Sequence, residues 1–113
     1  MKTLKNTTPV PNQVFSLLPQ LSGVEIKLLL TIIRSTIGWI NSDGRRKERD
    51  WIASSQFLKR TGVSERSVTT GIQSLIEKKL IKVTDFNGND LSNPQKRKFV
   101  TRIYYQTTLD NPD

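Results

Sequence analysis

Residues 65–79 combine one arginine, one amide and several hydroxyls with an apolar stripe at helical spacing. The stripe consists of Val68, Ile72, Leu75 and Ile76, which share one side of a helix. The outward side would then carry Arg66, whose guanidinium matches the acceptor edge of guanine, and Gln73, whose amide can pair with adenine. Thr69 and Thr70 can meet a phosphate or a thymine methyl. This side of the helix is predicted to contact DNA, with a plain solvated face as the alternative.

A second, shorter helix should come directly before this one. Residues 55–61 are amphipathic, and they lead into the tight turn Thr61-Gly62-Val63-Ser64, where Gly62 suits a positive φ and Ser64 can cap the next helix. Two helices joined in this way form a helix-turn-helix, whose second helix can enter the major groove. Ser64 and Ser67, at the start of that helix, are therefore predicted DNA contacts too.

The charge of the chain favours a polyanionic partner. Its 113 residues carry a formal net charge of +8, with a pI near 10.1. Part of this excess gathers in two clusters. Lys96, Arg97 and Lys98 are predicted to contact phosphates or the minor groove, and Arg45, Arg46 and Lys47 are predicted as a second phosphate contact. Charge kept only for solubility is the alternative explanation. Double-stranded DNA is the expected partner.

Catalysis and metal binding are not expected. The chain has neither histidine nor cysteine, so it lacks the commonest general base, the usual zinc ligands and any disulfide. Its carboxylates are scattered, and no nucleophile–base pair or phosphate-binding loop is evident. We predict no catalytic residue, no metal site and no cofactor. The absence of a signal peptide or membrane span predicts a cytoplasmic protein without a membrane partner.

The first half of the chain should supply a buried helix. Residues 1–13 are predicted to form a flexible arm. Ser22 and Glu25 form a capping box that starts a helix running to about Thr36 and ending before Gly38. Its apolar side chains predict a core position or a contact with a second copy. Residues 41–50 should be a surface loop, and Trp39 and Trp51 should anchor the core or a loop.

The second half should add a hairpin to the helix-turn-helix. Residues 80–84 and 99–105 read as strands, and the turn-rich segment between them would place Lys96, Arg97 and Lys98 near a wing tip. Gly71 weakens the helix that contains it, so close approach of another helix or of DNA is expected there. The fold class is α+β, mostly helical: a winged helix-turn-helix over residues 14–105, with three core helices and a C-terminal β-hairpin wing. Residues 106–113 are predicted to be a disordered tail or linker.

Several blocks resemble the N-terminal domain of phage replication protein O-type initiators. They are PNQVF at 11–15, LSGVEIKLLL at 21–30, IRSTIGW at 33–39, DWIASSQF at 50–57, TGVSERSV at 61–68 and LIEKKLI at 75–81. The resemblance covers roughly residues 9–105. Its helix-turn-helix part is shared by many regulators, whereas the block that ends in Gly38-Trp39 is more specific.

The resemblance implies a winged helix that binds repeated sites at a replication origin, often as a homodimer on inverted repeats. It implies base contacts from Arg66, Thr69, Thr70 and Gln73, and recruitment of host replication proteins through a separate C-terminal region. This sequence ends soon after the predicted wing, so it is expected to be either a fragment or a protein without the recruiting region. Two other functions fit the same fold. One is transcriptional regulation, and the other is docking onto replisome proteins with only weak, sequence-independent DNA binding.

Overall fold

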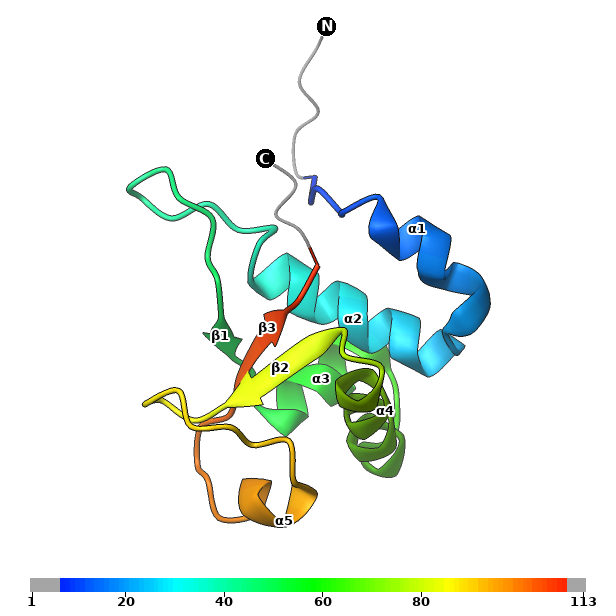
Figure 1. Cartoon of the computed structure of the whole chain (residues 1–113), viewed down its shortest axis with the longest axis vertical. Helices are drawn as coiled ribbons and strands as arrows, with labels where there is room; N and C mark the ends of the chain where they lie inside the picture. The colour runs from blue at the N-terminus through cyan, green and yellow to red at the C-terminus, as the bar shows by residue number, and fades with distance from the viewer. Residues whose placement is uncertain (1–6, 110–113) are drawn as a thin grey trace, which may run out of the picture.

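The computed structural model describes residues 7–109, which form helices packed against one small sheet (Figure 1). The helices are α1 (Gln13–Leu17), the 3-10 helix η1 (Leu18–Gln20), α2 (Gly23–Ser35), α3 (Ser54–Thr61), α4 (Glu65–Glu77) and α5 (Pro94–Arg97). The strands are β1 (Asp50–Trp51), β2 (Ile81–Thr84) and β3 (Tyr104–Thr107). The predicted α+β class with a helical majority is confirmed. Within the described residues, no helix is long and apolar enough to cross a membrane.

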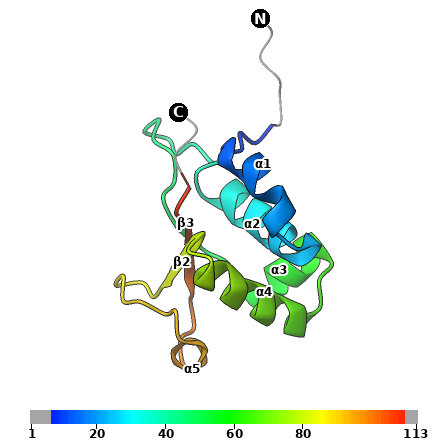
Figure 2. The same ribbon diagram turned by 45° about the vertical axis from the view of Figure 1, so that its right-hand side comes forward.

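The sheet is antiparallel, with β3 in the middle of the order β1-β3-β2. Ile81 pairs with Thr107 and Thr84 with Tyr104, while Trp51 pairs with Tyr104 on the other side. The central strand alternates, since Tyr105 and Thr107 are buried and their neighbours are half-buried. The long β2–β3 connection (residues 85–103) contains α5 (Figures 1 and 2).

Helix α2 is the centre of the core. Leu28, Leu29, Ile32 and Ile33 are fully buried, because α3, α4 and β3 pack around this helix. Complete burial of such a side chain stabilises the fold by about 1.5–3 kcal/mol. The predicted capping box is present: Ser22 Oγ accepts from the Glu25 amide at 3.1 Å, and Glu25 Oε1 accepts from the Ser22 amide at 2.9 Å. The helix ends at Ser35, as expected.

The turn between α3 and α4 also agrees with the prediction. Gly62 is the C-cap of α3 with φ +71°, and Ser64 Oγ caps α4 by accepting from the Ser67 amide. Helix α3 begins at Ser54, one residue before the predicted start, and its N-cap is Ala53. The Gln56 side chain serves the start of α3 instead, by accepting from the Ala53 amide at 3.3 Å.

Gly71 lies where α4 approaches α2 most closely. A Cβ added there would stand 2.5 Å from Leu28 Cδ1 and 3.0 Å from Val24 Cγ1. Both atoms belong to α2, so of the two alternatives left by the sequence the structure selects a neighbouring helix. The glycine weakens α4 locally but allows the two helices to pack together.

The predicted strand over residues 99–105 is wrong in position. Residues 99–103 are irregular, and β3 begins only at Tyr104. The alternating apolar residues predicted a strand here. The partner strand β2 has only four residues, however, and they pair with Tyr104 to Thr107, so the residues before Tyr104 have no partner in β2. The predicted disorder from residue 106 is therefore wrong for 106–109, where the Thr108 amide also donates to Leu80 O. Residues 110–113 lie outside the described part.

The predicted flexible arm also needs correction. Val10 packs against the core and Pro11 is buried, because the chain before α1 crosses the C-terminal end of α2. A Cβ on Gly38 would meet Thr8 Cγ2 at 2.6 Å, which shows how close this contact is. Residues 1–6 lie outside the described part, so the arm remains a prediction for them.

Of the two predicted roles for the tryptophans, core anchor or loop anchor, the first is wrong, because neither side chain is buried in the core. Trp39 is 61% exposed and Trp51 39% exposed. Trp51 lies on the edge strand β1, where the Arg102 guanidinium stands over its ring, 5.0 Å from the ring centroid. The loop expected over 41–50 contains a small antiparallel bridge, Ile40 to Arg46. We call residues 39–47 the 39–47 hairpin.

Gly71→Ala should destabilise the protein although alanine is the better helix former. The methyl group would have to displace Leu28 in a fully packed core, which costs about 1–3 kcal/mol. The gain in helix propensity is only about 1 kcal/mol. We expect a net loss of about 1 kcal/mol in the free energy of unfolding, measured by urea titration.

Gly23→Ala is the matched control, because no atom lies within 4 Å of a Cβ at that position in α2. It should leave the stability unchanged or slightly raised. An equal effect of the two substitutions would show that helix packing does not require Gly71.

Candidate nucleic-acid interface

The outward side of α4 carries the polar residues that the sequence singled out. Arg66, Thr69 and Thr70 are exposed, on the side opposite the buried Val68 and Leu75. Thr69 Oγ1 donates to Glu65 O at 3.2 Å, so its hydroxyl hydrogen is already used within the helix. Among residues 7–109 no hydrogen bond or ion pair engages the Arg66 side chain. Its guanidinium is therefore available to an external acceptor.

Gln73 is held by a residue from the other predicted cluster. Arg97 Nη2 donates to Gln73 Oε1 at 2.9 Å, and Arg97 Nη1 donates to Leu91 O and Ser92 O at 2.8 and 3.1 Å. Burial lowers the pKa of the Arg97 guanidinium, and the coulombic interaction with Tyr105 opposes this only in part. Arg97 was predicted to contact phosphates or the minor groove; in the structure it is half-buried and fixes the β2–β3 connection to α4.

The basic cluster that contains Arg97 lies beside α4 and not at the tip of the hairpin. Helix α5 begins at Pro94, and Asn93 caps it by accepting from the Gln95 amide. A groove of about 500 Å³ separates α5 from α4; its lining includes Thr69, Gln73, Pro94 and Arg97. Lys96 and Lys98 are exposed on the same segment. Two of the three predicted cations thus remain at the surface, next to the outward side of α4.

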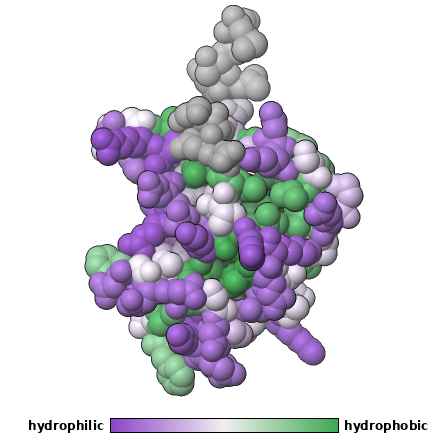
Figure 3. All heavy atoms as spheres, viewed as in Figure 1, coloured by the Kyte–Doolittle hydropathy of each residue, from purple (hydrophilic) through white to green (hydrophobic). Residues whose placement is uncertain are grey.

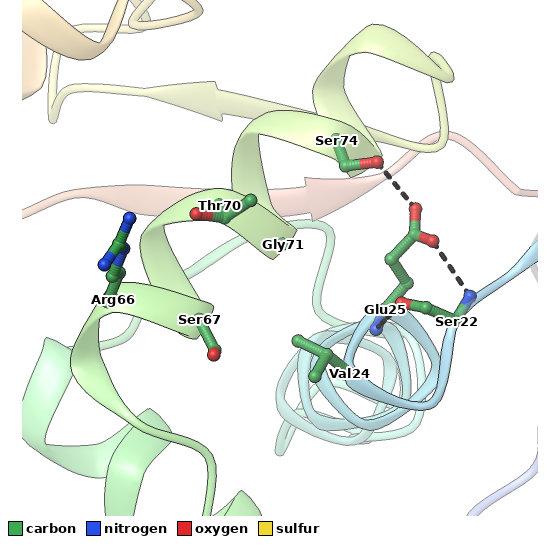
Figure 4. A pocket seen from close by; sticks show the side chains of 8 residues that line it. All are labelled: Ser22, Val24, Glu25, Arg66, Ser67, Thr70, Gly71 and Ser74. Atoms are coloured by element: carbon green, nitrogen blue, oxygen red, sulfur yellow. Dashed lines mark hydrogen bonds between the residues drawn. The ribbon is translucent and has the colours of Figure 1, made fainter.

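A second groove, of about 330 Å³, lies on the other side of α4, against the start of α2 (Figure 4). Arg66, Ser67 and Thr70 line it from α4, and Ser22 and Val24 from the α2 side. Ser64 and Ser67 were predicted to contact DNA, and here their hydroxyls bond each other at 3.0 Å as part of the α4 cap. The outward side of α4 is therefore a ridge between two grooves.

Glu25 closes the α2 groove with a polar network that sequence analysis recognised only in part. Ser74 Oγ donates to Glu25 Oε2 at 2.8 Å, and Lys78 Nζ lies 2.7 Å from the same oxygen (Figure 4 shows the serine contacts). Burial raises the pKa of Glu25, but the hydrogen bonds from Lys78, Ser22 and Ser74 outweigh it and bring the pKa down to about 2. The network ties α4 to α2. The capping box was its sole sequence signal.

The Arg45, Arg46 and Lys47 cluster lies elsewhere. The 39–47 hairpin and α5 stand at opposite ends of the molecule in Figures 1 and 2. Arg46 Nη1 donates to Ile37 O at 2.9 Å, and Lys47 pairs with Asp50 at 2.8 Å, whereas Arg45 is exposed. The structure thus divides the predicted site residues between two separate surfaces.

Arg49 has a structural role that the sequence did not indicate. Its guanidinium donates to Asp85 O at 2.9 Å and Phe86 O at 2.8 Å, and it lies 4.5 Å from the centroid of the Tyr104 ring. These contacts join the segment before β1 to the start of the β2–β3 connection. In the sequence Arg49 was indistinguishable from the neighbouring cations.

One comparison with known proteins gives a match. The family model of bacteriophage replication protein O matches residues 6–96, from the segment before α1 into α5. No curated protein and no solved structure matches the chain.

Glu25 makes the stability depend on pH in acid. Its pKa is lowered from 4.5 to about 2 on folding, so its stabilising effect is complete above pH 4.5 and is lost as the pH falls to 2. The shift corresponds to about 3 kcal/mol. In Glu25→Gln the free energy of unfolding should be lower at pH 6, and its fall between pH 5 and 2 should be shallower than in the wild type.

Urea titrations across this pH range measure the effect. Glu77→Gln, on the exposed end of α4, removes an acidic group outside the network and is the control. Parallel pH profiles for Glu25→Gln and the wild type would contradict the role assigned to Glu25.

Proposed function

Since the chain belongs to the bacteriophage replication protein O family, we propose that it binds specific double-stranded DNA at a phage replication origin. Family membership assigns the chain a role in phage DNA replication. The proposal adds the DNA partner, the surface that binds it and the fold type. In it, α2, α3 and α4 with the β2–β3 hairpin form a winged helix, and the β2–β3 connection is the wing.

The observation that carries the proposal is the exposed ridge of α4 with Arg66 and Thr70 on its outward side. The helix is 13 residues long, and grooves flank it on both sides, so it can protrude into a concave partner. The major groove of DNA is wide enough for such a helix. Arg66 lies in the first turns of α4, the part of a recognition helix that usually meets base edges.

The bond between Arg97 and Gln73 gives this surface a defined orientation. With Gln73 Oε1 engaged by Arg97, the amide nitrogen is the group left to donate to a base, for example to the N7 of a purine. A glutamine held in this way loses less rotamer entropy when it binds. We therefore assign Arg97 a positioning role and not a phosphate contact.

Lys96 and Lys98 are the cations best placed for phosphates beside the groove that α4 would enter. They are exposed and flank Arg97, which anchors their segment to α4. Phosphate contacts of this kind fix the register of a protein on DNA but carry no sequence information. In this proposal α4 reads the bases, α5 positions the protein on the DNA through phosphate contacts, and no catalytic step is involved.

Fluorescence anisotropy tests the proposal directly. Labelled fragments from around the protein's own gene would be compared with scrambled duplex across a salt series. A fragment bound on the order of 1,000-fold more tightly than the scramble would establish specific binding. Repeated sites within that fragment would favour an origin over a promoter. Equal affinity for every duplex would contradict the proposal.

Arg66→Ala should relax specificity at one base pair of the bound site. The loss should be about 1–3 kcal/mol on the specific site and much smaller on scrambled duplex, because the guanidinium would read a base edge. Arg45→Ala removes the same charge from the distant hairpin and serves as the control. A loss that is equal on all sequences for Arg66→Ala would show a phosphate contact and not base reading.

Replacing Lys96 and Lys98 with glutamine should weaken binding to every duplex. Two fewer phosphate contacts should reduce the slope of log K against log salt concentration by about two. The measurement is the same anisotropy series between low and moderate salt. Lys27→Gln, an exposed substitution on α2, is the control with an unchanged slope. An unchanged slope in the double variant would remove α5 from the interface.

A further inference from the structure

A third surface hollow, separate from α4, combines cations with an exposed aromatic ring. It has a volume of about 350 Å³ and lies where the C-terminal ends of α2 and α3 meet the 39–47 hairpin. Its lining residues are Arg34, Ser35, Trp39, Lys47, Asp50 and Arg60. We call it the Trp39 cleft. It contains three cationic side chains and one carboxylate.

The cationic side chains of the cleft are partly fixed in place. Arg60 Nη1 donates to Ser35 Oγ at 3.0 Å, so the end of α3 is tied to the end of α2. Lys47 pairs with Asp50 at 2.8 Å, which neutralises the carboxylate within the cleft. Arg34 is exposed. The two arginines therefore give the Trp39 cleft a net positive charge.

The backbone holds Trp39 at the rim of the cleft while its ring stays exposed. The Trp39 amide donates to Thr36 O at 2.8 Å, and Trp39 O accepts from the Lys47 amide at 3.0 Å. Despite this fixed backbone, the side chain is 61% exposed. The face of this ring is therefore accessible to a flat partner, and an indole ring can stack on one.

The helix termini explain only part of this arrangement. Arg34 and Arg60 lie in the last turns of α2 and α3, where a cation complements the partial negative charge of the helix end. That effect requires neither a hollow nor an exposed tryptophan in the same cleft as the two arginines. Cations lining a groove together with an aromatic platform are the features that bind single-stranded nucleic acid.

We propose that the Trp39 cleft binds single-stranded DNA, with one base stacked on Trp39 and the adjoining phosphates held by Arg34 and Arg60. A single strand fits better than a duplex, because the bases of a duplex are stacked on one another and present no face to an aromatic ring. The cleft contains no residue of α4, α5 or the β2–β3 connection. The site is therefore additional to the proposed duplex-binding surface and does not depend on it.

Tryptophan fluorescence tests the stacking. The chain has two tryptophans, so in Trp51→Phe the emission reports Trp39 alone. Titration with oligo(dT) of about 20 nucleotides should quench this emission, because a thymine stacks on the ring. If the emission of this variant stayed unquenched at saturating oligonucleotide, the proposal would be overturned.

Affinity measurements test the two arginines. Arg34→Gln combined with Arg60→Gln should raise the dissociation constant for fluorescein-labelled oligo(dT) roughly tenfold and make its salt dependence shallower. Trp39→Ala should also weaken binding roughly tenfold, without changing the salt dependence. The midpoint of thermal unfolding verifies folding, and Trp39→Phe should recover part of the affinity if the ring acts as a stacking surface.

A comparison with duplex separates this site from the proposed function. Arg66→Ala should leave oligo(dT) binding unchanged, whereas the Arg34 and Arg60 double variant should retain its preference for the specific duplex. An equal loss of duplex and single-strand affinity in the double variant would identify the cleft as a duplex backbone contact and overturn the proposal. If the wild type bound no duplex specifically, the proposed function would be refuted, while the single-strand site would be unaffected.

Discussion

The close packing of α4 against α2 is the constraint on which the rest of the structure depends. Gly71 permits the approach, since a side chain there would collide with Leu28 and Val24. Glu25 then secures it, because its buried carboxylate accepts hydrogen bonds from Ser74 and Lys78 of the α4 segment. The contact is apolar at its centre and charged at one end. It fixes both the distance between the helices and the direction in which α4 faces.

The orientation of α4 follows from this contact. With Val68, Ile72 and Leu75 committed to the core, the polar side that bears Arg66 and Thr70 faces solvent. The β2–β3 connection is then fixed relative to that side by Arg97, which joins Gln73 to two carbonyl groups of its own segment. A helix, a groove and a basic segment thus keep a constant spacing, which recognition of a periodic partner such as DNA requires.

Some basic residues make contacts within the fold, whereas others lie at the surface. Lys78, Arg49 and Arg97 make internal contacts that hold elements together. Others lie at two distant surfaces, one beside α4 and one at the 39–47 hairpin. In Figure 3 hydrophilic side chains make up much of the visible surface, and apolar ones gather over the helices in the upper part of the view. Net charge is therefore a poor guide to the interface until internal contacts are known, because a cation that is already paired gains little from a phosphate.

The local structure, that is, the helix caps, the turn and the amphipathic helices, was determined by the sequence alone. The capping box at Ser22, the positive φ of Gly62 and the apolar stripe of α4 were predictable, because each depends on residues a few positions apart. Only the tertiary structure decided the partner of Gly71, the position of β3 and the exposure of Trp39. It also decided that Arg97 binds Gln73 while Arg66 stays unpaired within residues 7–109. These features depend on contacts between segments far apart in the chain, and local residue patterns carry no information about such distances.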